Sequence, residues 1–227
     1  PPSSLVQPTS PPENRKERFL QKFKNTIVNW TIDNEERLIN GRKNYSWNDK
    51  NLIECLNERN RISKAIILSR IRNGGGVDLG TLDLVMNWGG FDSFSLRDAE
   101  AIMRITTEAF SLLDDGNVSS AINKLMSIHG VGISRASKII GLSDQDCYCI
   151  YDSRVGTALR GLKYDDKRLI LCPPGRLRGG DICTNNDWAE NYERLVWTLE
   201  VMRDYLNQKG YPFRIADVEM ALFMMGK

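Results

Sequence analysis

The sequence predicts an all-α fold, and three observations support that prediction. Apolar residues recur at helical spacing in segments that cover most of the chain. Runs that alternate apolar and polar residues, as half-buried strands do, are almost absent, and residues 147–150 are the one short candidate. Breaks rich in glycine and asparagine separate the periodic segments. We therefore expect a set of helices joined by short turns.

The first part of the chain is expected to hold a tail followed by short helices. Residues 1–12 are rich in Pro and Ser and predict a disordered tail, so the helical domain is expected at 13–227. Apolar spacing predicts one or two amphipathic helices in 13–40, a helix at 49–57 capped by Ser46 or Asn48, and a basic helix at 61–71. The glycines at 74–76 predict a turn or linker. They do not predict a nucleotide loop, because no Lys-Ser/Thr pair or Gly-x-Gly-x-x-Gly pattern accompanies them.

The second part of the chain is predicted to form six further helices. Ser95 is a capping candidate for the first of them. The segments with helical apolar spacing are 99–113, 121–128, 134–142, 154–162, 187–208 and 215–225.

The composition limits the chemistry that this protein can perform. The chain has 227 residues, 31 Lys and Arg against 29 Asp and Glu, and a single histidine, His129. One histidine argues against a Ser-His-Asp triad and against a histidine-based metal site, so catalysis would depend on a carboxylate, a Lys or a cofactor. The five cysteines are odd in number and irregularly spaced, which predicts a reducing, cytoplasmic setting. No apolar run approaches the roughly 18 residues of a membrane span, so we expect no membrane partner.

A glycine-containing turn between two short helices is the most informative motif. The predicted hairpin covers 121–142, with His129, Gly130 and Gly132 in the turn and Ser134 and Arg135 at the start of the second helix. Two glycines let the backbone turn sharply and leave amide N–H groups uncovered at the positive end of a helix dipole. Such a turn suits a phosphate, with a bound monovalent cation as the expected companion. The pattern alone is equally compatible with a helix connection that binds nothing.

An aspartate that follows this hairpin allows the pattern to be compared with a known protein family. Asp152 lies 18 residues after Ser134, at the start of the helix expected within 150–162, and Val155 follows three residues later. This arrangement resembles the helix-hairpin-helix (HhH-GPD) DNA glycosylase superfamily, and within it the 8-oxoguanine DNA glycosylase fold. The resemblance covers about 121–162 and implies a two-lobed helical domain that binds DNA.

The resemblance also implies which residues would act in catalysis. Asp152 would stabilise the sugar cation or activate water, although an ordinary N-cap would favour Asp at the same position. Family members that also cleave the strand carry a Lys where this chain has Ser134, which argues against a lyase reaction. Lys138 lies one turn later on the same helical face and could supply an amine, but a phosphate contact or a solvated charge is the commoner role. Arg154 replaces a His of the family pattern and could reach a phosphate.

A glycosylase extrudes its target nucleotide and stacks the base against apolar groups. Trp88 and Phe223 are candidate pocket residues, with Phe91 and Phe213 as further aromatic candidates, and Glu219 on the last helix could face the base. An aromatic side chain at helical spacing is more often part of the core.

Charge and cysteine patterns complete the prediction. Residues 153–178 hold seven basic and two acidic side chains, a net +5, whereas 92–115 hold six acidic and two basic side chains, a net −4. A basic segment beside the hairpin suits phosphate contacts, although charge runs are usually solvated faces. Arg59, Arg61, Lys64, Arg70 and Arg72 form a second basic cluster. Only Cys172 and Cys183 follow Asp152, so we expect no iron–sulfur cluster, no zinc and no other cofactor.

The sequence therefore predicts a DNA N-glycosylase that hydrolyses the bond to a damaged or modified base, with an oxidised purine as the expected substrate. The alternative is a catalytically silent protein that binds DNA or a protein partner through the same hairpin.

Overall fold

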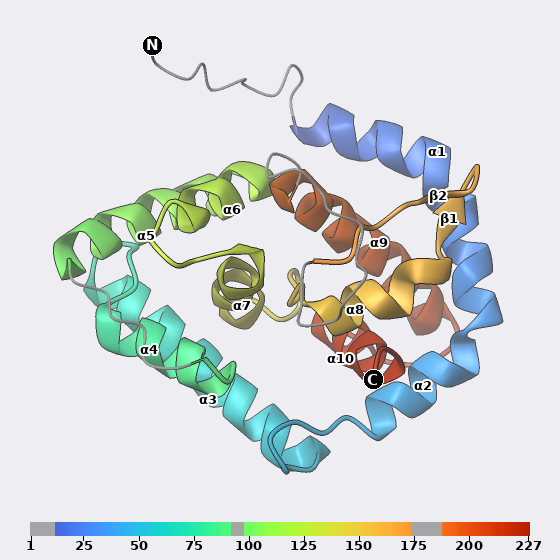
Figure 1. Ribbon diagram of the computed structural model, residues 1–227, viewed down its shortest axis with the longest axis horizontal. Helices are drawn as coiled ribbons and strands as arrows, with labels where there is room; N and C mark the ends of the chain where they lie inside the picture. The colour runs from blue at the N-terminus through green and yellow to red at the C-terminus, as the bar shows by residue number, and fades with distance from the viewer. Residues whose placement is uncertain (1–11, 92–97, 174–187) are drawn as a thin grey trace.

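The computed structural model describes residues 12–91, 98–173 and 188–227. Helices account for nearly all of the regular structure in these ranges (Figure 1), so the all-α prediction is confirmed at this level. The α-helices are α1 (Pro12–Asp33), α2 (Glu35–Lys43), α3 (Leu52–Arg72), α4 (Leu79–Trp88), α5 (Ala99–Asp114), α6 (Val118–Met126), α7 (Ile133–Ser143), α8 (Ser153–Ala158), α9 (Trp188–Gln208) and α10 (Ile215–Met225). The predicted tail, Ser95 and Cys183 lie outside the described residues, apart from Pro12 at the start of α1.

Helix α7 occupies the middle of the arrangement (Figure 1). It contacts α3, α4, α6 and α9. Helices α3 to α6 lie to one side of α7 in this view, and α1, α2, α8 and α10 lie to the other. On that second side, α10 packs on α2, α8 and α9, and α1 packs along α9. The two groups of helices therefore meet at α6 and α7, the helices of the predicted hairpin, both of which contact α9.

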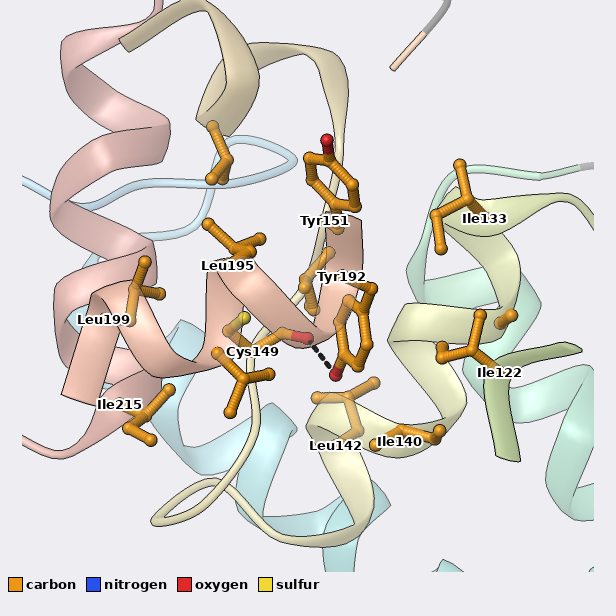
Figure 2. Close-up of a cluster of buried hydrophobic side chains, with 14 of the residues drawn as sticks. Ile122, Ile133, Ile140, Leu142, Cys149, Tyr151, Tyr192, Leu195, Leu199 and Ile215 are labelled. Atoms are coloured by element: carbon orange, nitrogen blue, oxygen red, sulfur yellow. Dashed lines mark hydrogen bonds between the residues drawn. The ribbon is translucent and has the colours of Figure 1, made fainter. Parts of the chain in front are cut away.

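The core beside α7 is apolar and fully enclosed. Figure 2 shows side chains from α6, α7, α9 and α10 meeting around the segment that leads to α8. Cys149 and Tyr151 of that segment are buried among them, and the Tyr192 hydroxyl of α9 donates a hydrogen bond to the Cys149 carbonyl at 2.9 Å. A buried backbone carbonyl needs such a partner. The bond therefore fixes the chain three residues before Asp152.

The prediction of separate helices at 49–57 and 61–71 is wrong. Helix α3 continues without a break, because no Gly or Pro lies between the two segments and Arg59 is buried inside the protein. Neither Ser46 nor Asn48 caps it. Asn51 does so, in a capping box with Glu54, and Asn48 instead takes a positive φ of 51° in the preceding turn. Burial also removes Arg59 from the second basic cluster.

Two predictions after the hairpin also need correction. Residues 147–150 form no strand: Cys147 is exposed at the end of a turn, Cys149 and Ile150 are buried, and no strand in the described ranges pairs with them. The helix expected at 154–162 ends at Ala158 and continues as a 3-10 turn, Leu159–Gly161. A short antiparallel pair follows, β1 (Lys163–Tyr164) and β2 (Lys167–Arg168). Its two-residue turn has positive φ at Asp165 and Asp166, which is the geometry of a tight hairpin.

Helix α4 has no counterpart among the predicted helices, and α6 begins three residues before the expected start at 121. The other predicted helices lie close to the observed ones. The expected helix at 215–225 coincides with α10, and 187–208 with α9 except at its first residue. The glycines at 74–76 form a turn, with positive φ at Gly74 and Gly75. Among the described residues, no helix has both the length and the apolar character that a membrane span requires.

Candidate active site

The turn between α6 and α7 adopts the predicted hairpin form. Gly130 has φ of 80°, a conformation that favours glycine, and Gly132 is the N-cap residue of α7. Ile128, Val131 and Ile133 are buried and anchor the turn, whereas His129, Gly130 and Gly132 are exposed. A Cβ atom at Gly132 would meet no neighbour within 4 Å, so the backbone there is open to a ligand. The Arg135 guanidinium donates to the Gly130 carbonyl at 2.7 Å and lies 4.5 Å from the Phe91 ring centroid.

Ser134 and Lys138 lie on the same face of α7, one turn apart. The Lys138 ammonium reaches back along the helix and donates to the Ser134 hydroxyl at 3.1 Å. Only 6% of Lys138 is exposed, which is unusual for a lysine. The structure therefore places the Lys138 nitrogen beside Ser134, the position where the resembling strand-cleaving enzymes carry their lysine.

The Lys138 side chain packs against Gly89, the C-cap residue of α4. A Cβ atom at Gly89 would come within 2.9 Å of Lys138 Cδ and Cε, so the glycine leaves room for the lysine stem. The Lys138 nitrogen lies 5.1 Å from the centroid of Phe91, which is therefore between two basic groups, Lys138 and Arg135. Burial lowers the pKa of Lys138, and the carboxylates of Asp152 and Glu219 partly oppose this effect. A lowered pKa increases the fraction of neutral amine, the nucleophilic form.

Two contacts fix the Asp152 segment against α7. The buried Ser137 hydroxyl accepts a hydrogen bond from the Tyr151 N–H at 2.9 Å. At Gly141, a Cβ atom would lie 2.6 Å from the carbonyl carbon and oxygen of Cys149, so only glycine permits this close approach. Because Ser137 adjoins Lys138 and Tyr151 adjoins Asp152, these contacts hold the two candidate catalytic residues in a fixed relation.

Asp152 caps α8. One carboxylate oxygen, Oδ1, accepts from the N–H groups of Arg154 and Val155, both at 3.0 Å. The N-cap role that the sequence left open is therefore real, but it uses one oxygen. The residue is half-buried, and its charge acts on Lys138. Capping and catalysis are compatible, since a capped carboxylate is held in one orientation.

Glu219 occupies a buried ion pair. Its Oε2 atom lies 2.6 Å from Nη2 of Arg59, and the two side chains are 2% and 0% exposed. Burial raises the pKa of Glu219, and Arg59 opposes this effect. The Arg59 Nε atom also donates to Gln145 at 3.2 Å. Glu219 therefore joins α10 to α3 through this ion pair, and its negative charge also acts on Lys138. Sequence reasoning did not single out Arg59 as its partner, because 160 residues separate them.

Aromatic rings from three elements gather near the start of α8. Trp47 lies 5.5 Å from Phe223 and 6.5 Å from Trp88, measured between ring centroids. The Arg154 guanidinium lies 4.6 Å from the Phe223 centroid and 5.7 Å from that of Trp47. Trp88 and Phe223 are almost fully buried, and the Trp88 Nε1 atom has no hydrogen-bond partner within the described part of the chain. Trp47 was missed, since a lone Trp in a polar turn carries no helical pattern.

The predicted site residues thus fall into two groups. His129, Gly130 and Gly132 form an exposed turn beside the half-buried Arg135 of α7. Ser134, Lys138, Asp152 and Glu219 lie around the buried face of α7. Phe213 lies apart from both, against Tyr211 at a centroid distance of 6.4 Å. Within the ranges that the structure describes, no cluster of three His, Cys, Asp or Glu side chains could hold a metal ion. Arg160, Lys163 and Lys167 of the basic segment are exposed, whereas Arg176 and Arg178 lie outside the described residues.

Comparisons with known proteins add no assignment: no protein-family model, no curated protein and no solved structure matches the chain.

Proposed function

We propose that this protein is a helix-hairpin-helix DNA N-glycosylase that releases a damaged or modified base from DNA. The observation that carries the proposal is the grouping of Lys138, Ser134 and the Asp152 carboxylate beneath an exposed, glycine-containing hairpin turn. A plain helix connection needs no buried lysine, and because burying one costs free energy, such a residue is a candidate for a functional role.

Asp152 would act on the sugar of an extruded nucleotide. As the bond to the base breaks, positive charge develops on C1′ and the ring oxygen, and a fixed carboxylate stabilises that charge. The base leaves with the bonding electron pair and takes up a proton. A water molecule adds to C1′ and gives its proton to Asp152 or to solvent, which leaves an abasic site. The backbone N–H groups that hold Oδ1 keep the carboxylate in place.

A second activity, cleavage of the strand, is favoured by the position of Lys138. Its neutral amine would attack C1′ in place of water, the base would leave with the bonding electrons, and the ring C1′–O4′ bond would then open to give a Schiff base. The imine would make the C2′ proton acidic, and elimination of the 3′-phosphate would break the strand. The buried amine beside Ser134 supports this route, whereas Ser134 itself, in place of the family lysine, supports the water route.

The resemblance makes an oxidised purine the expected target. Trp88 and Phe223, two of the predicted pocket residues, are almost fully buried and belong to the core. Of the rings named above, the half-buried Trp47, near Arg154, and the half-buried Phe91, near Lys138, are the ones that a base could reach. Aromatic surface of this kind suits a stacked base.

Incubation with lesion-containing duplexes tests the proposal. Purified protein would be given separate duplexes with 8-oxoguanine, adenine opposite 8-oxoguanine, uracil or an alkylated base, and the products would be resolved with and without alkali. We expect strand breaks after alkali on at least one duplex. Breaks without alkali, together with a borohydride-trapped adduct lost in Lys138→Met but kept in Lys124→Met, would establish the lyase route. Lys124 lies on α6, the first helix of the hairpin, and pairs with Glu108.

The silent-binder alternative has its own signature. Such a protein would bind all duplexes with similar, salt-dependent affinity and would release no base from any of them. That result would refute the proposed enzyme while leaving the hairpin as a DNA contact.

A further inference from the structure

A cleft lies on the side of the molecule formed by α1, α9 and the β1–β2 hairpin. Its volume is about 560 Å³, which falls within the usual range for small-molecule sites. None of the residues grouped around Asp152 lines it. Figure 1 shows the hairpin lying against α1, with α9 behind. The cleft therefore forms a separate site, and nothing in the proposed glycosylase chemistry uses it.

A ladder of four aromatic rings runs along this cleft. Trp197 lies 5.3 Å from Phe19, Phe19 lies 5.1 Å from Phe23, and Phe23 lies 5.1 Å from Tyr164, all between ring centroids. Trp197 and Phe19 are buried, and Phe23 and Tyr164 are half-buried. The outer end of the ladder is therefore accessible to a planar ligand, while the inner end is part of the core.

The polar lining of the cleft is predominantly basic. Six of its side chains are Lys or Arg and three are Asp or Glu, so its formal net charge is +3. Two of the acids have partners of their own. Glu193 is buried and accepts from Arg15 at 3.2 Å, and Glu190 pairs with Arg194 at 3.4 Å. Arg15 and Arg194 are therefore engaged by carboxylates of the lining, and the formal charge of the lining residues as a set remains +3.

Lys22 connects the charge to the aromatic ladder. Its ammonium lies 5.2 Å from the Phe23 centroid and 5.3 Å from that of Tyr164, and the residue is exposed. Lys167 and Arg168 enter the lining from the hairpin strand opposite. A ligand seated on Tyr164 would thus have a cation beside its ring and further basic groups within the same cleft.

We propose that this cleft binds a nucleoside phosphate, with the base against Phe23 and Tyr164 and the phosphate among Lys22, Lys167 and Arg168. Each half of the ligand matches one half of the site. Phosphate alone would leave the aromatic surface unused, and a neutral aromatic compound would leave the basic groups unused. The ligand has two possible sources, a free nucleotide or one residue of a single strand, and both present the same chemistry.

Isothermal titration calorimetry with defined probes tests this inference. The full chain would be titrated with dAMP, deoxyadenosine, inorganic phosphate and the trinucleotide d(AAA). We expect dAMP to bind at least tenfold more tightly than deoxyadenosine or phosphate. Tighter binding of the trinucleotide than of dAMP would identify a strand as the source, and equal or weaker binding would identify a free nucleotide.

Matched variants locate the binding site. Lys22→Ala and Tyr164→Leu should each weaken dAMP binding at least fivefold, whereas Lys24→Ala, an equally exposed lysine on α1 outside the cleft, should not. Asp152→Asn should bind dAMP like the wild type, which separates this site from the proposed active site. The inference is overturned if no probe binds at millimolar concentration, if dAMP binds no better than its parts, or if Lys22→Ala and Tyr164→Leu leave its affinity unchanged.

Discussion

Removing Glu219 should destabilise the protein strongly, because the substitution would strand a charge in the interior. Arg59 is fully buried, and Glu219 is its ionic partner at 2.6 Å. After Glu219→Leu, the guanidinium would keep its hydrogen bond to Gln145 and its position 5.5 Å from the Trp88 centroid. Neither contact neutralises its charge. Breaking a buried pair by removing one partner costs about 3–5 kcal/mol.

Thermal and urea unfolding would measure this loss. For a chain of this size, 3–5 kcal/mol corresponds to a fall in Tm of roughly 6–20 °C. The double variant Arg59→Met/Glu219→Leu should recover most of the loss, because no unpaired charge remains and the replacements are apolar. An exposed pair provides the control: Glu190→Gln, which breaks the pair with Arg194, should change the stability by less than about 0.5 kcal/mol. A loss below about 1 kcal/mol for Glu219→Leu, or a double variant as unstable as the single one, would refute the reasoning.

Substitutions at three further positions test the architecture of the site. Asp152→Ala should lower the free energy of unfolding, measured in urea, by about 1 kcal/mol because the α8 cap is lost. Asp152→Asn should cost less, since its side-chain oxygen can accept the same N–H groups. Equal losses for the two variants would contradict the capping geometry. Lys138→Met should stabilise the protein by about 1 kcal/mol at pH 7, because it removes a buried charge. Burial lowers the pKa of Lys138, so the free energy of unfolding of the wild type rises with pH between that lowered pKa and the ordinary value of about 10.4. The stability advantage of Lys138→Met should therefore shrink across that window. A constant advantage would refute the lowered pKa. Gly141→Ala should cost about 1–3 kcal/mol, measured by thermal unfolding, because its Cβ would lie 2.6 Å from the Cys149 backbone; wild-type stability would contradict that packing.

Local patterns predicted the helices well where apolar spacing and a terminal break coincide. Helices α9 and α10 follow their predicted ranges to within a residue in the described part of the chain. The failure at α3 lies in the polar stretch between the two expected helices. Asn57, Glu58 and Asn60 have polar side chains, but none of them stops a helix, and the polar Arg59 between them is buried. Long-range burial, which no local window contains, decided that boundary.

In the candidate site, too, the local motifs were predictable from the sequence and the long-range contacts were not. The hairpin and Asp152 are recognisable from spacing along the chain, because each is a local motif. The contacts that bring them together are not, since Ser137 and Gly141 act on backbone that lies 8 to 14 residues further along. A glycine within a helical run was the available signal, because glycine in a helix interior often marks a close approach. The Arg59–Glu219 pair left no such signal.

The rate of base release by Asp152→Asn tests the central claim most directly. Base release would be measured under single-turnover conditions on whichever lesion duplex the wild-type protein cleaves, with Asp144→Asn as the matched control. Asp144 also uses Oδ1 to accept two backbone N–H groups, those of Asp146 and Cys147, but it is exposed at the end of α7. We expect Asp152→Asn to release the base at least about 100-fold more slowly than the wild type, and Asp144→Asn to stay within about twofold. Base release by Asp152→Asn at the wild-type rate, or no release from any duplex by the wild-type protein, would contradict the proposed function.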